Sequence, residues 1–217
     1  MPASFPSDPG LAAFGSSLTA ITLAELGDKT FFMALILAVR YPRRWVFLGS
    51  FAALSAVTLI SLGLGYGLRR LLDASVVPWL AALLFLAFGI KLLIDAQGMG
   101  ADEADEEERE AENAINQAER QGAISTTWAV IWEAFALVFV AELGDRTQFA
   151  TIFLATAPAF TFAGLLAGTL VGHALVTWLA VGAGKWIGSR VDERLLYRLS
   201  GGLFVAFGLV SLAQALA

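Results

Sequence analysis

The sequence predicts an all-α integral membrane protein with six transmembrane helices, arranged as two inverted three-helix repeats. Three observations support this. Of 217 residues, 58% are hydrophobic and 15% are charged, with a mean hydropathy of +0.71, whereas soluble domains carry about 25% charged residues. The apolar residues form six runs, each close to the roughly 20 residues needed to cross a bilayer. One seven-residue motif occurs twice in the chain.

Polar breaks and prolines set the limits of the six runs. Pro42 follows the first run, Pro78 opens the third, and Pro158 separates the fourth from the fifth. At these places proline removes no hydrogen bond from a helix interior. The six predicted helices are Leu11–Val39, Trp45–Leu68, Pro78–Ile94, Thr127–Ala155, Phe160–Val181 and Leu195–Leu216.

An acidic connector separates the third run from the fourth. Residues 101–120 hold nine acidic residues and two arginines, which is typical of a solvated linker with helical tendency. Basic residues gather in the connectors on this side, so we expect it to be cytoplasmic and both termini to lie outside. No Lys or Arg precedes the first run, and the run is too long for a signal peptide, so we expect it to be retained. The predicted units are a first repeat at 1–96, an acidic cytoplasmic linker at 97–125 and a second repeat at 126–217.

The repeated motif carries most of the information on organisation. Residues 24–30, AELGDKT, recur as residues 141–147, AELGDRT, with one conservative change. A weaker match relates Phe85–Gly89 to Phe204–Gly208. Because each half holds three helices, an odd number, the second half must start from the opposite side of the membrane. Such inverted repeats recur in secondary transporters, where the binding site lies near the midplane between the repeats.

The two motifs place six ionisable side chains deep in apolar runs. A charged group at a helix centre costs roughly 2.5–3.5 kcal/mol, so these groups must pair, protonate, bind an ion or face a hydrated cavity. Fully ionised, the set carries a charge of −2, which one divalent cation or two protons would neutralise. The lysine and arginine would hold the carboxylates ionised and replace a departing metal ion. The four carboxylates are Glu25, Asp28, Glu142 and Asp145, and the two bases are Lys29 and Arg146.

The residue types favour a hard, oxygen-rich cation site. Carboxylate, hydroxyl and carbonyl oxygens suit Mg²⁺, Ca²⁺ and Mn²⁺. The chain has no cysteine and one histidine, which argues against a site specialised for zinc or copper. Thr30 and Thr147 are candidate hydroxyl ligands. Gln148 offers an amide oxygen in the second half only, because Phe31 stands at that place in the first.

Several glycines and two further polar residues leave alternatives open. Gly27 and Gly144 would allow either a close backbone approach or a local helix break that exposes carbonyl oxygens. His173 is either a proton relay or a packing histidine, and its counterpart in the first half is Leu54. Glu133 is either an interfacial residue or a vestibule carboxylate. A ridge of glycines at four-residue spacing predicts a close helix contact, with gating as the alternative; it consists of Gly164, Gly168 and Gly172.

The duplicated motif Glu-x-Gly-Asp-(Lys/Arg)-(Thr/Ser), at residues 25–30 and 142–147, resembles the signature of the Gdt-type cation/proton antiporters, the second calcium/cation antiporter family. The resemblance covers nearly the whole chain, including the acidic central connector. It implies Mn²⁺ and Ca²⁺ as transported ions, protons as the counter-ion and no cofactor. The ligands that it implies are Glu25, Asp28, Glu142 and Asp145, with Thr30, Thr147 and Gln148 as additions.

These observations together predict a transporter, not an enzyme, that exports Mn²⁺ or also Ca²⁺ from the cytoplasm in exchange for protons. We expect it in a bacterial inner membrane. The expected partners are the lipid bilayer and a divalent cation, but no nucleic acid, and the sequence leaves open whether the protein forms a homo-oligomer. The alternatives are an exporter of basic amino acids, a channel, and an intramembrane hydrolase with paired carboxylates. Mn²⁺ and Ca²⁺ accept the same oxygen donors, so these residues do not choose between them.

Overall fold

The computed structural model describes residues 8–73, 75–98, 104–121, 126–157, 160–187 and 193–216. Within these residues every regular element is a helix, and four of them (α3, α4, α8 and α9) are long and apolar enough to cross a membrane. The bent pair α6 and α7 would be a fifth span. The chain is therefore an α-helical membrane protein. Its helices are α1 (Pro9–Glu25), α2 (Lys29–Arg40), α3 (Arg43–Leu71), α4 (Val77–Gly98), α5 (Ala104–Gln121), α6 (Thr127–Glu142), α7 (Arg146–Thr156), α8 (Phe162–Ile187) and α9 (Glu193–Leu216).

The first and fourth apolar runs are each two helices. The predictions of continuous helices at Leu11–Val39 and Thr127–Ala155 are therefore wrong, because α1 and α6 each end at the motif glutamate. At each break a glycine adopts the left-handed conformation, with φ of 77° at Gly27 and 84° at Gly144. A side chain disfavours this conformation, so glycine is needed there. Helix α7 leaves α6 at an angle of 68°. Of the two alternatives for the motif glycines, a local helix break is the one observed.

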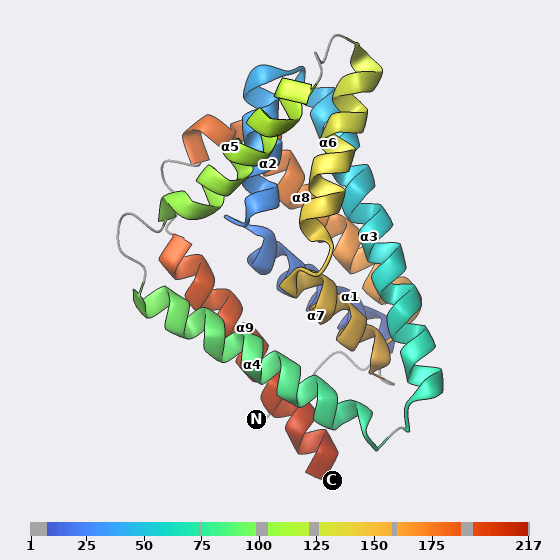
Figure 1. The fold of residues 1–217 in the computed structure, drawn as a ribbon. Helices are drawn as coiled ribbons and strands as arrows, with labels where there is room; N and C mark the ends of the chain where they lie inside the picture. The colour runs from blue at the N-terminus through green and yellow to red at the C-terminus, as the bar shows by residue number, and fades with distance from the viewer. Residues whose placement is uncertain are drawn as a thin grey trace.

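Equivalent helices of the two halves make equivalent contacts. Helix α1 packs along α8, and its counterpart α6 packs along α3. Likewise α2 packs against α8, and its counterpart α7 packs against α3. Helices α3 and α8 also contact each other, so they form the centre of the bundle. Helices α4 and α9 pair along one flank, where Figure 1 shows them in green and red.

Glycines allow these helices to approach closely. Gly168 on α8 lies against the Phe14 carbonyl and the Ser17 hydroxyl of α1, and Gly49 on α3 lies against the Ile131 carbonyl of α6. A methyl group at either glycine would overlap backbone atoms of the neighbouring helix. Small residues at such crossings are a general means of close packing between membrane helices. The glycine ridge that faces α1 consists of Gly164, Gly168 and Gly172.

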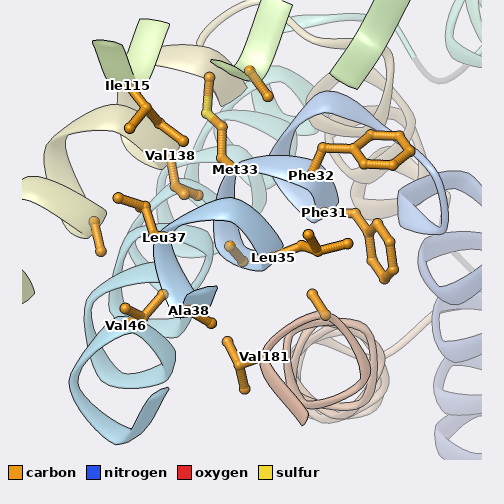
Figure 2. Packing of buried hydrophobic residues seen from close by; sticks show 14 of the residues in the cluster. Phe31, Phe32, Met33, Leu35, Leu37, Ala38, Val46, Ile115, Val138 and Val181 are labelled. Atoms are coloured by element: carbon orange, nitrogen blue, oxygen red, sulfur yellow. The ribbon is translucent and has the colours of Figure 1, made fainter. Parts of the chain in front are cut away.

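The acidic connector contains a docked helix, so the expectation of a solvated linker holds for only one of its faces. Helix α5 buries Ala111 and Ile115 completely. Figure 2 shows Ile115 in the same apolar cluster as Leu37 of α2. At the far end of α2, Arg40 Nη1 lies 2.7 Å from Glu119 Oε2 of α5. Helix α2 is therefore enclosed by α3, α5, α6 and α8.

Candidate cation site

Two glutamates end helices at the centre of the bundle. Glu25 is the last residue of α1 and Glu142 the last residue of α6, with exposed fractions of 1% and 2%. Thr30 Oγ1 donates a hydrogen bond of 3.2 Å to Glu25 Oε2, and Thr147 Oγ1 donates one of 3.2 Å to Glu142 Oε2. The threonine after each helix break therefore holds one oxygen of the glutamate before it.

Three carboxylates converge where the two halves meet. One oxygen each of Glu25, Asp28 and Glu142 lies within 4.8 Å of the others, and all three residues are buried. Oε1 of each glutamate is buried without a hydrogen-bond partner, an arrangement that costs free energy in a folded protein. Oxygen ligands lie about 2.0–2.6 Å from Mg²⁺ or Ca²⁺, so oxygens of one ion are at most about 4–5 Å apart. The three carboxylates have the chemistry and spacing to hold one divalent cation.

The fourth carboxylate of the motifs faces the start of α7. Asp145 Oδ2 accepts a hydrogen bond of 3.1 Å from the backbone N–H of Thr147, so it caps this helix. The same oxygen lies 3.1 Å from the Thr147 hydroxyl, whose one hydrogen is shared between Asp145 and Glu142. Gln148 Oε1 accepts a hydrogen bond of 2.7 Å from the Gly144 N–H. Both side chains thus stabilise the helix break of the second half, and the converging group consists of the other three carboxylates.

The motif lysine reaches toward α5. Lys29 Nζ lies 3.9 Å from Glu110 Oε2, beside a groove of about 530 Å³ that Glu133 also lines. Glu133 therefore lies on the wall of this groove, and its role as an interfacial or a vestibule carboxylate stays a prediction. The side chain of Arg146, the other predicted base, lies outside the described residues.

Two small cavities flank the converging carboxylates, one beside each glutamate. Each has a volume of about 10 Å³, the space of a single water molecule. Sequence reasoning missed the hydroxyl groups that line them. The available signal was a polar residue at every third or fourth position in otherwise apolar helices. These hydroxyl groups belong to Ser50, Thr58, Ser61, Thr151 and Thr177.

His173 of α8 borders both cavities. Its exposed fraction is 5%, and its Nδ1 atom is buried without a hydrogen-bond partner. The Nδ1 atom lies 3.9 Å from Glu25 Oε1. A histidine that serves only packing normally satisfies its buried polar atoms, so this one is not explained by packing alone.

The fold and the site together define a class of protein, the ion transporters of membranes. Broken membrane helices with buried acidic residues at the break are features of secondary transporters. A family model described as "Divalent cation/proton antiporter GDT1" matches residues 13–100 and again residues 130–217. The chain belongs to this family, a family of transporters. The resemblance found in the motifs is confirmed.

Several curated relatives match most of the chain. GDT1-like protein sll0615 of Synechocystis sp. is 43% identical over 202 residues, which cover 93% of this chain and 97% of the relative. GDT1-like protein 1, chloroplastic, of Oryza sativa subsp. japonica is 38% identical over 212 residues, or 93% of this chain and 62% of the relative. Protein PAM71, chloroplastic, of Arabidopsis thaliana is 38% identical over 214 residues, or 94% of this chain and 57% of the relative. No solved structure matches the chain.

Proposed function

We propose that this protein exports Mn²⁺ from the cytoplasm in exchange for protons, with Ca²⁺ as a second substrate, across a bacterial inner membrane. Membership of the family supports exchange of a divalent cation for protons. The observation that carries the proposal is the convergence of Glu25, Asp28 and Glu142 from both halves. A cation held by these oxygens links α1, α2 and α6. Movement of one half against the other would therefore change how the cation is bound.

Each broken run crosses the membrane once in this proposal, which gives six spans. Helix α1 has 17 residues and α2 has 12, about 25 Å and 18 Å at about 1.5 Å per residue. Together they are long enough for a hydrocarbon core of about 30 Å. Three spans per half give the halves opposite orientations, with the termini outside and α5 in the cytoplasm. The units are the repeats 1–96 and 126–217, joined by the linker 97–125.

The same carboxylates serve both ions in the proposed exchange. While the metal ion is bound, its charge stabilises the ionised carboxylates. When the ion leaves, buried like charges so close together repel each other, and protons replace the metal. Four further residues complete the proposed binding region, because they form hydrogen bonds with the neighbouring backbone or with the glutamate oxygens. They are Asp145, Thr30, Thr147 and Gln148. Rocking of one half against the other then exposes the site to each side in turn.

The size of the cavities supports an ion as the substrate. A volume of about 10 Å³ beside each glutamate accommodates one water molecule or a cation that has lost most of its water. A basic amino acid, the alternative substrate, would need a much larger space between the same carboxylates.

The experiment is Mn²⁺ uptake into proteoliposomes under an imposed pH gradient. We expect the Glu25→Gln/Glu142→Gln double variant to lose at least about 100-fold in rate, because two of three converging oxygens lose their charge. Glu108→Gln, on the exposed face of α5, is the matched control and keeps the wild-type rate. Equal rates for the double variant and wild type, at equal protein content, contradict the proposed site. Uptake that ignores the pH gradient contradicts the proposed proton exchange.

A further inference from the structure

His173 is the only histidine in the chain and lies between the two cavities. The cavity beside Glu25 and the cavity beside Glu142 both have His173 in their lining. Leu54 of α3, its counterpart in the first half, lines both cavities as well. The centre of the bundle therefore presents an imidazole ring on one side and an isobutyl group on the other, next to the converging carboxylates.

The imidazole Nδ1 lies near one of the converging carboxylates, that of Glu25, without bonding to it. His173 Nδ1 and Glu25 Oε1 are both buried, both lack a hydrogen-bond partner, and lie 3.9 Å apart. This separation is too long for a hydrogen bond. It suits two ligands of one ion, since ligand atoms about 2.1 Å from a metal lie at most about 4.2 Å apart. Glu142 Oε1 is a second buried glutamate oxygen without a partner.

A nitrogen donor changes which ions the site prefers. Ca²⁺ in proteins takes oxygen ligands, whereas first-row divalent transition-metal ions accept nitrogen donors as well, with an affinity that is lowest for Mn²⁺ within that series. Carboxylates alone would serve both kinds of ion. We propose that His173 is a nitrogen ligand of the transported cation and that it makes the site favour Mn²⁺ over Ca²⁺. This inference rests on the proposed function.

The asymmetry of the two halves is a consequence of this assignment. The motif supplies carboxylates from both halves, but only α8 supplies a nitrogen, because Leu54 stands at the equivalent place in α3. The substitution His173→Leu therefore gives both halves the same apolar side chain at this position. It removes the nitrogen ligand and leaves Glu25, Asp28 and Glu142 unchanged.

The first test observes the metal–nitrogen bond directly. Full-length protein without a polyhistidine tag is loaded with Mn²⁺, and electron spin-echo modulation of the bound ion is recorded. We expect coupling to a ¹⁴N nucleus, which changes to the ¹⁵N pattern when the protein is grown with ¹⁵N-histidine. Because the chain has one histidine, the label marks His173 alone. Bound Mn²⁺ without histidine nitrogen coupling overturns the inference.

The second test measures selectivity in proteoliposomes with Mn²⁺ and Ca²⁺ as separate substrates. We expect His173→Leu to raise the KM for Mn²⁺ at least about tenfold while the KM for Ca²⁺ stays within about twofold. His173→Gln, which replaces the nitrogen ligand with an amide oxygen, is expected to shift the preference in the same direction. The control is Thr169→Val, a buried residue one turn earlier on α8 with an exposed fraction of 1%. It keeps the wild-type ratio.

The outcomes separate this inference from the proposed function. If wild-type protein moves neither ion in exchange for protons, the proposed function fails and the inference fails with it. If wild type moves Mn²⁺ and His173→Leu leaves the Mn²⁺ to Ca²⁺ ratio unchanged, or lowers both rates equally, only the nitrogen-ligand inference fails. If His173→Leu does not fold, the spin-echo measurement on wild-type protein still decides whether the histidine nitrogen binds the ion.

Discussion

The two cavities beside the converging carboxylates occupy equivalent places in the two halves, but their linings differ in polarity. Where the cavity beside Glu142 has Gln148 and Thr151, the equivalent residues beside Glu25 are Phe31 and Ala34. Phe31 also belongs to the apolar cluster that surrounds α2, where Figure 2 shows it beside Phe32. Both cavities are lined by hydroxyl groups, but the one beside Glu142 also has an amide group, where the one beside Glu25 has an aromatic ring that belongs to an apolar cluster.

This difference shows that the repeated motif and the residues around it determine different properties of the site. The motif gives each half the same charges, whereas the residues one or two turns later decide whether water is stable beside them. In the proposed orientation α7 leads from the site to the outer face and α2 leads to the cytoplasm. The side chains around α2 pack closely beside Glu25.

Among the tests of this comparison, the largest effect is expected from giving the cavity beside Glu142 the aromatic ring that lines the cavity beside Glu25. Gln148→Phe removes the acceptor of the Gly144 N–H, and a hydrogen bond of this kind contributes about 0.5–1.5 kcal/mol. The ring also fills the cavity beside Glu142. We expect Mn²⁺ transport in proteoliposomes to fall at least about tenfold.

The reciprocal change, Phe31→Gln, serves as the control for that prediction. It replaces the aromatic ring beside Glu25 with an amide and leaves the bond between Gln148 and Gly144 intact. We expect it to retain more transport than Gln148→Phe. The opposite order of the two transport rates would show that the polarity of the cavity beside Glu142 has no special role.

A second comparison concerns the helix contacts that the two halves share. Gly168→Ala and the equivalent Gly49→Ala would overlap backbone atoms of α1 and α6, and overpacking of this kind costs about 1–3 kcal/mol. Gly182→Ala and Gly63→Ala meet no atom within 4 Å, so they should be neutral or stabilising by up to about 1 kcal/mol. Thermal unfolding in detergent measures all four, and similar Tm values would contradict the packing described.

Substitution of the glycine at each helix break should lower the Tm by a similar amount in the two halves. Gly27→Ala and Gly144→Ala force a side chain into the left-handed conformation, with an expected cost of about 1–2 kcal/mol each. No atom lies within 4 Å of a methyl group built on Gly144, so its cost is conformational strain. A Tm lowered by one substitution and unchanged by the other would show that the breaks are not equivalent.

The smallest effect is expected where α5 meets α2. Arg40 pairs with Glu119 at 2.7 Å and with Glu112 at 3.7 Å, and partly exposed pairs contribute at most about 1 kcal/mol. Arg40→Ala should speed hydrogen exchange in α5 a few-fold without changing exchange in α8. The effect should shrink at high salt because exposed charges are screened. Protection of α5 that is unchanged by the substitution would show that apolar contacts alone hold it.

Tyr41 gives the same contact a pH dependence. Its hydroxyl donates a 2.8 Å hydrogen bond to Glu119 Oε1, and burial together with this carboxylate raises the pKa of Tyr41 to about 12. The neutral phenol is favoured in the folded state, so its contribution to stability is present below about pH 10 and is lost as the pH rises toward 12. The difference in ultraviolet absorbance between wild type and Tyr41→Phe should titrate near pH 12. A midpoint near pH 10 would contradict the contact.

Much of the architecture follows from the sequence because charge in hydrocarbon is costly. The carboxylates of the motifs could be expected to meet, and Glu25, Asp28 and Glu142 do so. The apolar runs α3, α4, α8 and α9 lie where hydropathy predicts them. These features depend on residue type and spacing, which the sequence displays directly.

Other features depend on conformation and long-range contact. The runs around the motifs are apolar on both sides of the break, so hydropathy does not reveal where each helix stops, and only Gly27 and Gly144 gave a hint. The acidic composition of the connector concealed the buried pair Ala111 and Ile115, although their spacing of four residues was visible. Nothing in the sequence indicated that Lys29 would reach Glu110 of α5.

The attachment of α5 to α2 has a consequence for following this protein at work. Helix α2 carries Lys29 next to the carboxylates and Arg40 at its far end, and α5 is bonded to both residues. Displacement of α2 would therefore either move α5 with it or break the contacts between the two helices. A fluorophore on the solvent-facing side of α5 would therefore report each turnover from outside the bilayer, with no label near the ion.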